Sequence, residues 1–283
     1  MKILITGLSG FLGSQLANAL VTEYDLAGAI RSSSKLDRIN CKSEITLINV
    51  ENDKWIEDVK KFNPSIVINT AALYGRKNES LSELIDANIV FPQKIIECMG
   101  ADTVFVNCGT SLPSSVSLYA QTKNLFVDLA KEYCKSNRIK FLNLRLEHFF
   151  GANDDSTKFT SYVIHQCLAN RPLKLTKGTQ ERDFLYIEDL ISAFRCIIDS
   201  VNKLESFENI DIGSGCAITI RGFVELVVFI TASTSIIEFG AVPMREHELM
   251  HSCADTHRIK SLGWCLHYPL ANAIVDMIIK ENK

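Results

Sequence analysis

The sequence predicts an α/β protein built on a doubly wound parallel sheet, with a smaller C-terminal lobe. Three observations support this fold class. The first half of the chain contains six short apolar runs, helical patterns lie between most of them, and a glycine-rich turn follows the first run. Runs this apolar are typical of strands covered on both faces, as in parallel sheets. Alternation of strands with helices is the pattern of doubly wound folds.

The expected strands are the six apolar runs, at residues 2–6, 26–30, 44–50, 65–71, 103–108 and 140–146. Helices are expected at 11–24 and 80–99, where apolar residues recur at helical spacing. The pattern loosens in the second half of the chain. We therefore predict a nucleotide-binding domain at 1–147 and a smaller substrate-binding lobe mainly at 148–283. A stretch at about 183–215 is expected to return to the first domain.

Composition narrows the class of protein. Apolar residues make up 47% of the chain, charged residues 22%, and the formal charge is −3, which is ordinary for a globular protein and gives no basic face for nucleic acid. Nine cysteines without a Cys-x-x-Cys motif disfavour a disulfide framework or a metal site, and they favour a reducing cytoplasm. No apolar run has the length of a membrane span. We expect a cytoplasmic protein with neither a nucleic-acid nor a membrane partner.

Three glycines follow the first expected strand, in Thr-Gly-Leu-Ser-Gly-Phe-Leu-Gly at residues 6–13. Gly7 can turn the chain, Gly10 lets a pyrophosphate approach the backbone, and Gly13 lets the next helix pack closely. The helix N-terminus offers free N–H groups to the anion. This arrangement predicts a Rossmann-like dinucleotide site. Its cofactor-binding residues are expected to be Gly7, Ser9, Gly10, Phe11, Leu12 and Gly13.

The end of the second strand indicates which dinucleotide binds. An NAD site usually has Asp or Glu there, to accept hydrogen bonds from the ribose hydroxyls. Here the strand is followed by Arg31 and Ser32, with Lys35 shortly after and no acid among them. An arginine and a serine are suited to holding a 2′-phosphate. We therefore expect NADP(H) as the cofactor.

Tyr119 and Lys123 stand four residues apart and would share one face of a helix. The ordinary pKa of a tyrosine is about 10, and a nearby ammonium lowers it. We therefore expect Tyr119 to exchange a proton with the substrate, while Lys123 tunes this tyrosine and bonds the cofactor's ribose. Thr110 or Ser111, at the end of the fifth expected strand, would polarise a substrate oxygen.

These residues together resemble the extended short-chain dehydrogenase/reductase family along essentially the whole chain. Further segments similar to that family are Asn69-Thr70-Ala71-Ala72, Asn88, Arg182-Asp183-Phe184, Gly213-Ser214-Gly215 and Leu262-Gly263-Trp264. The resemblance implies that Ala71 and Ala72 line the cofactor and that Asn88 supports the sheet near the active site. It also implies that Arg182 and Arg245 grip the diphosphate of a nucleotide sugar.

The segments FVNCGTSLP, LRLEHFFGANDD and QERDFLYIEDL resemble one branch of this family more closely. Members of that branch reduce the 4-keto group of a CDP-linked 3,6-dideoxyhexulose, giving CDP-paratose or CDP-abequose for O-antigen synthesis. FVNCGTSLP, followed so soon by Tyr119, is more similar to the paratose enzyme. The resemblance also implies a homodimer paired through the helix that carries Tyr119. The residues expected to bind substrate are Tyr74, His148, Lys158, Phe159, Arg182 and Arg245.

Several alternatives remain at this level. Dehydratases of the family place an Asp-Glu pair after the polarising threonine, and no acid follows Thr110 here. An epimerase would keep its NAD bound, whereas a reductase exchanges its cofactor. A nucleotide-sensing regulator could keep the fold without catalysis, but it would not need Tyr119 and Lys123 at helical spacing. His148, where many relatives have Asn, either contacts the sugar or diphosphate or packs as a hinge residue.

Overall fold

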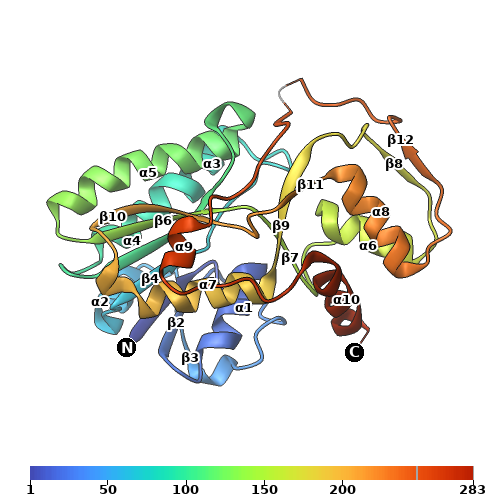
Figure 1. Ribbon diagram of the computed structural model, residues 1–283. Helices are drawn as coiled ribbons and strands as arrows, with labels where there is room; N and C mark the ends of the chain where they lie inside the picture. Colours follow the sequence, from blue (N-terminus) through green and yellow to red (C-terminus); the bar gives the residue numbers. More distant parts are fainter. Residues whose placement is uncertain (247, 283) are drawn as a thin grey trace. The chain divides into compact units, whose positions relative to one another are not determined.

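The computed structural model describes residues 1–246 and 248–282 of the chain (Figure 1). The chain divides into two compact units. The first contains Met1–Arg145 and Ile198–Ile210, and the second contains Leu146–Ile197 and Asp211–Lys283. Assigning the cofactor to one unit and the substrate to the other remains a prediction.

A seven-stranded sheet has the order β10-β6-β5-β4-β1-β2-β3, and the pairings β1–β2, β2–β3, β1–β4 and β4–β5 are parallel. Its strands are β1 (Lys2–Thr6), β2 (Asp25–Ile30), β3 (Ile45–Asn49), β4 (Ile66–Asn69), β5 (Val104–Thr110), β6 (Lys140–Leu146) and β10 (Phe207–Ile212). The chain builds β1, β2 and β3 outward, then returns to place β4 on the other side of β1. This reversal is the switch point at which doubly wound sheets bind ligands. The predicted Rossmann-like α/β fold class is confirmed.

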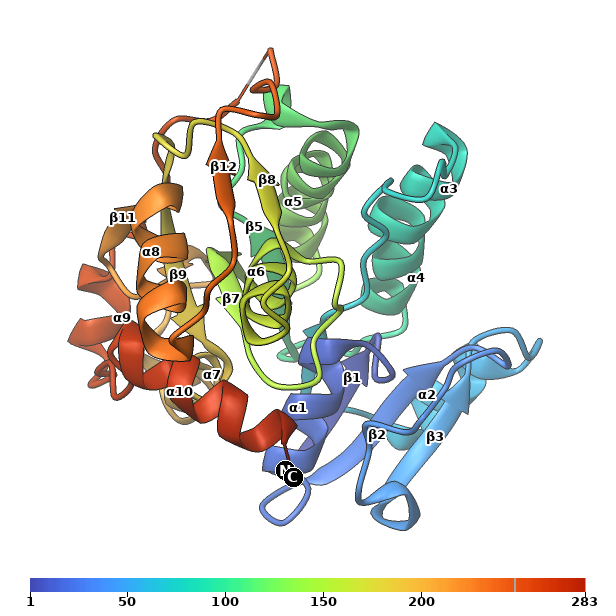
Figure 2. The same cartoon turned by 90° about the vertical axis from the view of Figure 1, so that its right-hand side faces the viewer.

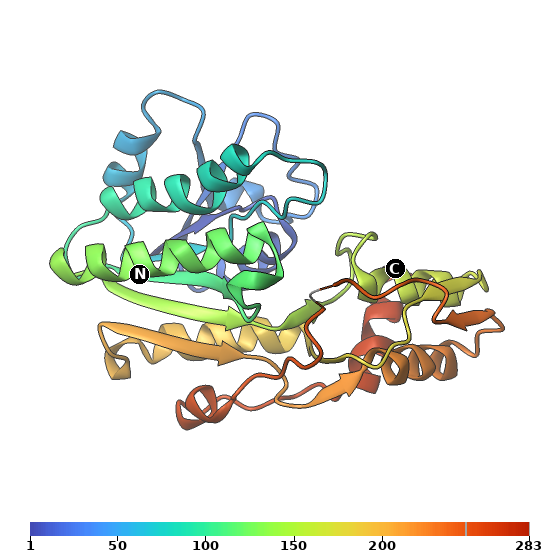
Figure 3. The same cartoon turned by 90° about the horizontal axis from the view of Figure 1, so that it is seen from above.

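Helices of the first unit connect these strands. They are α1 (Phe11–Leu20), α2 (Trp55–Phe62), α3 (Leu81–Ile85), α4 (Phe91–Glu97) and α5 (Leu118–Ser136), with short 3-10 turns at Lys42–Glu44, Ser114–Val116 and Val201–Lys203. Figures 2 and 3 show α4 and α5 side by side over the sheet. Such helices leave the carboxyl ends of the strands accessible to ligands.

The helix predicted at 80–99 is interrupted by a π-helical turn at Asp86–Val90, between α3 and α4. Pro92 lies in the first turn of α4 and has no N–H to donate to the carbonyl of Asn88, four residues earlier. The N–H of Phe91 instead bonds the carbonyl of Asp86, five residues back. Such π turns are frequent at functional sites, and this one carries the buried Asn88.

A ladder of polar side chains crosses five neighbouring strands. The Thr6 hydroxyl donates to the Asn69 side chain at 2.6 Å, and Asn69 donates to Asn107 at 3.0 Å. Asn107 donates to Asn143 at 2.9 Å, and Asn143 donates to Asn209 at 2.8 Å. Thr6, Asn69, Asn107 and Asn143 are buried, so breaking any of these bonds would leave a buried polar group without a partner, which costs stability. The ladder therefore fixes how these strands align.

Aromatic packing attaches α5 to the sheet. Phe126 of α5 packs edge-on against Phe105 of β5, with ring centroids 6.2 Å apart, and against Phe141 of β6 at 6.0 Å. Phe105 and Phe141 stack on one another at 5.6 Å. All three side chains are fully buried. The helix that carries the expected reacting pair is thus held by the central aromatic core.

The second unit contains a three-stranded sheet of β11 (Ala217–Thr219), β9 (Glu181–Tyr186) and β7 (His148–Phe150), and a pair of β8 (Leu173–Leu175) with β12 (Ile237–Phe239). Its helices are α6 (Phe159–Leu168), α7 (Ile187–Asp199), α8 (Ile220–Thr231), α9 (His257–Ser261) and α10 (Leu270–Glu281). Across residues 1–246 and 248–282, no helix combines the length and the apolar character needed to span a membrane.

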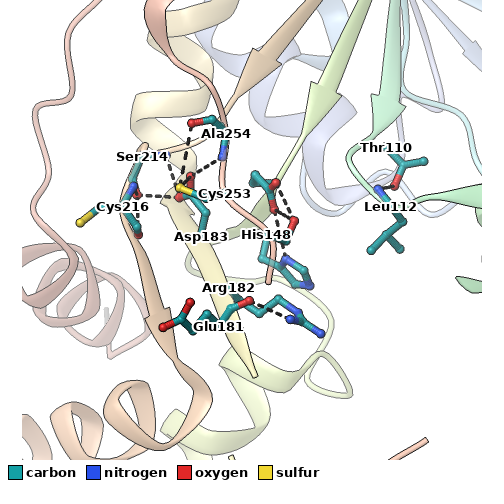
Figure 4. A network of polar contacts seen from close by, with 12 residues as sticks. Thr110, Leu112, His148, Glu181, Arg182, Asp183, Ser214, Cys216, Cys253 and Ala254 are labelled. Atoms are coloured by element: carbon teal, nitrogen blue, oxygen red, sulfur yellow. Dashed lines mark hydrogen bonds and ion pairs between the residues drawn. The ribbon is translucent and has the colours of Figure 1, made fainter. Parts of the chain in front are cut away.

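The buried Asp183 of β9 organises this unit (Figure 4). Its carboxylate accepts hydrogen bonds from the backbone N–H groups of Ser214, Gly215 and Ala254, at 2.8, 2.9 and 3.2 Å, and from the Ser214 hydroxyl at 2.6 Å. Several donors offset the cost of burying one charge. Asp183 therefore binds two loops, distant in sequence, to the same strand.

Replacing Phe126 by Ala should lower the free energy of unfolding by about 3–5 kcal/mol, because it opens a cavity among three buried rings. Urea denaturation measures this change. Glu132→Ala is the control, since Glu132 is exposed on the same helix. Equal stability losses in the two variants would contradict the aromatic anchoring of α5.

Candidate active site

The glycine loop has the geometry that its three glycines predict. Gly7 adopts a φ of 65°, and a Cβ there would lie 2.8 Å from the Cα of Ala71. A Cβ on Gly13 would lie 2.4 Å from the carbonyl oxygen of Gly7. The N–H of Gly10 donates to the same carbonyl at 2.9 Å. Any side chain at Gly7 or Gly13 would force the backbone apart, so the glycines hold the loop tightly against β1 and α1.

The first turn of α1 is suited to an anion. Gly10 is its N-cap residue and provides no side chain to cap the helix. The predicted residues Phe11, Leu12 and Gly13 form that turn and are buried, while Ser9 is half-buried and Gly10 exposed. Uncapped N–H groups at a helix N-terminus attract phosphate. The residues present therefore fit the pyrophosphate of a dinucleotide.

Ala71 and Ala72 follow β4 beside this loop. Both are half-buried, and the N–H of Ala71 donates to the Thr6 hydroxyl at 3.3 Å. Thr70 donates through its hydroxyl to the carbonyl of Thr6 at 2.7 Å. The segment expected to line the cofactor is thus hydrogen-bonded to the end of β1.

The residues expected to select NADP lie in an exposed turn after β2. Arg31, Ser32 and Lys35 are all exposed, and Lys35 lies two residues beyond the turn. The N–H of Ser32 donates to the carboxylate of Glu51 at 2.9 Å. Sequence reasoning considered only the end of β2 and missed Glu51, which follows β3 and reaches back to this turn.

Tyr119 and Lys123 both lie in α5, four residues apart and therefore on one face. The Ser117 hydroxyl accepts from the N–H of Ala120 at 3.1 Å, which starts the helix immediately before Tyr119. Lys123 is 1% exposed, and Tyr119 is half-buried. The helix thus places a buried ammonium one turn from a tyrosine.

Burial controls the proton affinities of this pair. Desolvation lowers the pKa of Lys123 to about 8, opposed only in part by the Cys108 thiol. Desolvation also raises the pKa of Tyr119, with further contributions from Tyr74 and Cys108. The sequence predicts a lowered pKa for Tyr119, and in this structure the pKa is raised instead, because burial outweighs the opposing charge, which comes from Arg76 rather than Lys123. Burial also raises the pKa of Cys108 to about 12, so this residue stays a thiol.

Tyr74 is brought against Tyr119, with ring centroids 4.8 Å apart. The side chain of Asn88 accepts from the N–H of Leu73 at 2.9 Å and donates to the carbonyl of Leu73 at 3.0 Å. It also donates to the Thr122 hydroxyl at 3.0 Å. Asn88 therefore holds the segment before Tyr74 against the helix of Tyr119. This role is more specific than the support of the sheet that the sequence implied.

Thr110 is the last residue of β5 and is 9% exposed, while Ser111 is half-buried. The N–H of Leu112 donates to the Thr110 hydroxyl oxygen at 3.2 Å (Figure 4). A hydroxyl that accepts one bond still has its proton to donate. Gly109 precedes it, where a Cβ would lie 2.3 Å from the side-chain oxygen of Asn143. The polar ladder thus passes directly beneath this end of β5.

Two of the expected substrate-binding cations are paired with acids in the second unit. Arg182 donates to Glu248 at 2.6 Å, and its side chain is 8% exposed. Burial lowers the pKa of Arg182, while Glu248 opposes the shift. Lys158 donates to Asp154 at 2.9 Å.

Three further expected substrate-binding residues, His148, Phe159 and Arg245, also lie in the second unit, whereas Tyr74 lies in the first. His148 is exposed, 3.7 Å from the Glu147 carboxylate, and packs edge-on to Phe184 with ring centroids 6.1 Å apart. Phe159 starts α6 and packs near Phe223 at 5.8 Å. Arg245 is exposed in the loop after β12. Within the described part of the chain, no cluster of His, Cys, Asp and Glu side chains could hold a metal ion.

Residues 3–213 match the family described as NAD dependent epimerase/dehydratase. The chain is 30% identical to a CDP-abequose synthase of Salmonella muenchen over 98% of this chain and 97% of that protein. It is 27% identical to a CDP-abequose synthase of Salmonella typhimurium, with the same coverage of both. These matches confirm the resemblance that the sequence motifs carry.

Solved structures show the same fold. The UDP-glucuronic acid 4-epimerase of Bacillus cereus, in complex with UDP-glucuronic acid and NAD, superposes with a TM-score of 0.86 at 23% identity, covering 100% of this chain and 99% of that one. The UDP-glucose 4-epimerase of Thermotoga maritima, with UDP-glucose, also has a TM-score of 0.86, at 18% identity, covering 99% and 98%.

The buried ammonium of Lys123 gives a testable stability effect. Its pKa of about 8 lies below the ordinary lysine value of 10.5, so charging it costs the folded state stability at pH 7. Lys123→Met should therefore raise the free energy of unfolding at pH 7, by on the order of 1–3 kcal/mol. The gain should shrink as the pH rises from 8 to 10.5, because the wild-type lysine becomes neutral when folded.

Urea denaturation of both proteins at pH 7 and at higher pH measures this difference. Lys135→Met on the exposed side of α5 is the matched control and should show no such pH-dependent gain. A loss of stability in Lys123→Met at pH 7 would mean that other groups offset the buried charge.

Proposed function

Because the chain belongs to the NAD dependent epimerase/dehydratase family, we propose that it uses NADPH to reduce the 4-keto group of a CDP-linked 4-keto-3,6-dideoxyhexose. The observation that carries the proposal is the pairing of Tyr119 with the buried Lys123 on one face of α5. The CDP-abequose synthases that the chain resembles over nearly its whole length support the substrate class.

Tyr119 is the proton donor in this proposal. A ketone reduction needs an acid that still carries its proton at neutral pH, and burial raises the pKa of Tyr119. When bound, NADPH supplies the hydride to the carbonyl carbon, and the phenol proton goes to the carbonyl oxygen. The product is a secondary alcohol, and the phenolate then regains a proton from solvent.

Lys123 provides positive charge beside the phenolate that forms when Tyr119 gives up its proton. Its pKa of about 8 leaves it mostly protonated at pH 7. Charge in a buried environment acts strongly, since little water screens it. Lys123 also has the length to hydrogen-bond the nicotinamide ribose, which would orient the cofactor over the sugar.

Thr110 is our preferred partner for the substrate oxygen, with Ser111 as the alternative. The Thr110 hydroxyl accepts from Leu112, which orients its proton for donation. A preorganised donor at the developing alkoxide stabilises the transition state. Tyr74, whose ring lies tilted against that of Tyr119, would contact the sugar.

The second unit supplies the expected nucleotide contacts in this proposal. Arg182 and Arg245 would bind the diphosphate, since a guanidinium matches phosphate oxygens. His148, Lys158 and Phe159 would contact the sugar or the nucleotide. The Glu248 carboxylate forms an ion pair with Arg182 in the structure, so the diphosphate would have to replace this carboxylate to bind Arg182.

We propose CDP-paratose as the product, rather than its C4 epimer CDP-abequose. The support is the segment 105–113, which, together with its short distance in sequence from Tyr119, is more similar to the enzyme that makes CDP-paratose. Two CDP-abequose synthases match 98% of the chain at 27% and 30% identity, which makes the other epimer the direct competitor. NMR of the product formed from CDP-4-keto-3,6-dideoxyglucose and NADPH distinguishes the two.

An epimerase is the second candidate, because the structural neighbours with TM-scores of 0.86 are UDP-sugar 4-epimerases. An epimerase regenerates its bound cofactor, so it consumes none. Net oxidation of NADPH in proportion to product would favour the reductase, and product formation without net oxidation would favour the epimerase.

Replacing Tyr119 by Phe should lower kcat by about 10²- to 10⁴-fold, because the ring remains and the transferable proton is lost. NADPH binding, followed by fluorescence titration, should change little. Tyr133→Phe in the same helix is the matched control and should retain turnover. Near-wild-type turnover in Tyr119→Phe would assign the proton transfer to another group.

We also propose a homodimer paired through α3 and α5. Three exposed leucines lie along one face of α5, at positions 118, 125 and 129, and Leu81 and Ile85 are exposed on α3. Residues seven and four apart share a helix face. An apolar stripe of this kind is characteristic of an association surface.

The double substitution Leu125→Glu and Leu129→Glu should convert the dimer to a monomer, because charges would have to be buried in the interface. Light scattering after size-exclusion chromatography measures the mass. Lys135→Glu is the control on the same helix. A wild-type mass already equal to one chain would contradict the proposed dimer.

A further inference from the structure

Glu51 holds the turn that follows β2 through Ser32. The Ser32 N–H donates to the Glu51 carboxylate at 2.9 Å, and the Ser32 hydroxyl bonds the same carboxylate. Asn49 positions this pair, since its side chain donates to the Ser32 hydroxyl oxygen at 2.9 Å and accepts from the N–H of Glu51 at 3.0 Å. Glu51, just after the end of β3, thus places a carboxylate at the turn after β2, where the sequence contains no Asp or Glu.

The groups around Glu51 form a small anion-binding turn. Its pKa is lowered by the hydrogen bonds from the Ser32 hydroxyl and N–H, and then by the charge of Arg31. The turn itself is closed by the N–H of Arg31 donating to the Ser34 hydroxyl at 3.0 Å, and by the N–H of Ser34 donating to the carbonyl of Arg31 at 2.9 Å. These bonds leave the Ser32 donors facing an anion.

The donors that hold Glu51 are those that a 2′-phosphate would need. Ser32 and Arg31 were the residues expected to hold that phosphate, and in the structure they face an internal carboxylate. One set of donors cannot fully satisfy both anions, and like charges at hydrogen-bonding distance repel. A carboxylate can instead accept hydrogen bonds from two ribose hydroxyls, as in NAD sites.

We propose that Glu51 is the residue that sets the preference between NADP and NAD, by competing with the 2′-phosphate for Ser32 and Arg31. This inference rests on the proposed function only in placing the adenosine ribose at the end of β2. The carboxylate penalises NADP and supports the ribose diol of NAD. The protein therefore retains NAD affinity, and removing the charge of Glu51 increases selectivity for NADP.

The test uses two probes of the adenosine end alone, adenosine 2′,5′-bisphosphate and 5′-AMP, in calorimetric titrations of the full-length protein. Glu51→Gln keeps the shape and an oxygen that can accept from Ser32, but it loses the charge. It should strengthen binding of the bisphosphate relative to 5′-AMP by about ten-fold, the scale of one like charge removed at contact distance. Asp53→Asn is the matched control, because it removes the same charge from an exposed residue two positions away.

A second variant tests whether the Ser32 hydroxyl itself contributes to binding of the 2′-phosphate. Ser32→Ala removes the shared hydroxyl donor and should weaken the bisphosphate more than 5′-AMP. An affinity ratio for Glu51→Gln equal to that of Asp53→Asn, or shifted toward 5′-AMP, would overturn the proposal.

These outcomes are separate from the fate of the proposed reductase. The probes carry no nicotinamide, and their binding does not require the nucleotide-sugar substrate. A shifted affinity ratio of the two probes therefore supports the role of Glu51 even when the ketosugar is not reduced. Turnover of the ketosugar with an unshifted affinity ratio of the two probes supports the reductase and contradicts the role of Glu51. Failure of both probes to bind any variant would remove the adenosine site and contradict both proposals.

Discussion

The carboxyl ends of β1, β4 and β5 are held in alignment by buried side-chain hydrogen bonds from Thr6 to Asn69 and from Asn69 to Asn107. Buried amides are costly when unpaired, so a shift of any strand by one residue would break several bonds together. The glycine loop follows β1, and Thr110 ends β5. The spacing between the glycine loop and the Thr110 hydroxyl therefore depends on this ladder.

A second constraint is the dry environment around α5. Burial pushes the pKa of Lys123 down and that of Tyr119 up, so both shifts favour the neutral forms. A reductase benefits from this, because its tyrosine must arrive protonated and release the proton only as negative charge develops on the substrate. The same burial weakens the fold, which is a common cost of a preorganised active site.

The sequence could predict what depends on local pattern. The doubly wound fold class, the glycine loop and the helical pairing of Tyr119 with Lys123 follow from periodicity, glycine spacing and a known family resemblance. It could not predict interactions between distant segments. The reach of Glu51 from β3 to Ser32, the clamp of Asn88 on Leu73 and the pairing of Arg182 with Glu248 all need the tertiary fold. The direction of the Tyr119 pKa failed for the same reason, since burial is not a local property.

Cofactor preference shows why such distant contacts matter. The residues after β2 alone indicate a phosphate site, because Arg31 is a cation, Ser32 is a hydrogen-bond donor, and no acid lies beside them in the sequence. Folding brings Glu51 to that turn and supplies the missing acid from another strand. A donor set that already binds a carboxylate will discriminate between dinucleotides by how well each ligand replaces or complements that carboxylate. In our proposal, selectivity at this turn is thus a competition between two anions, the Glu51 carboxylate and the 2′-phosphate of the dinucleotide.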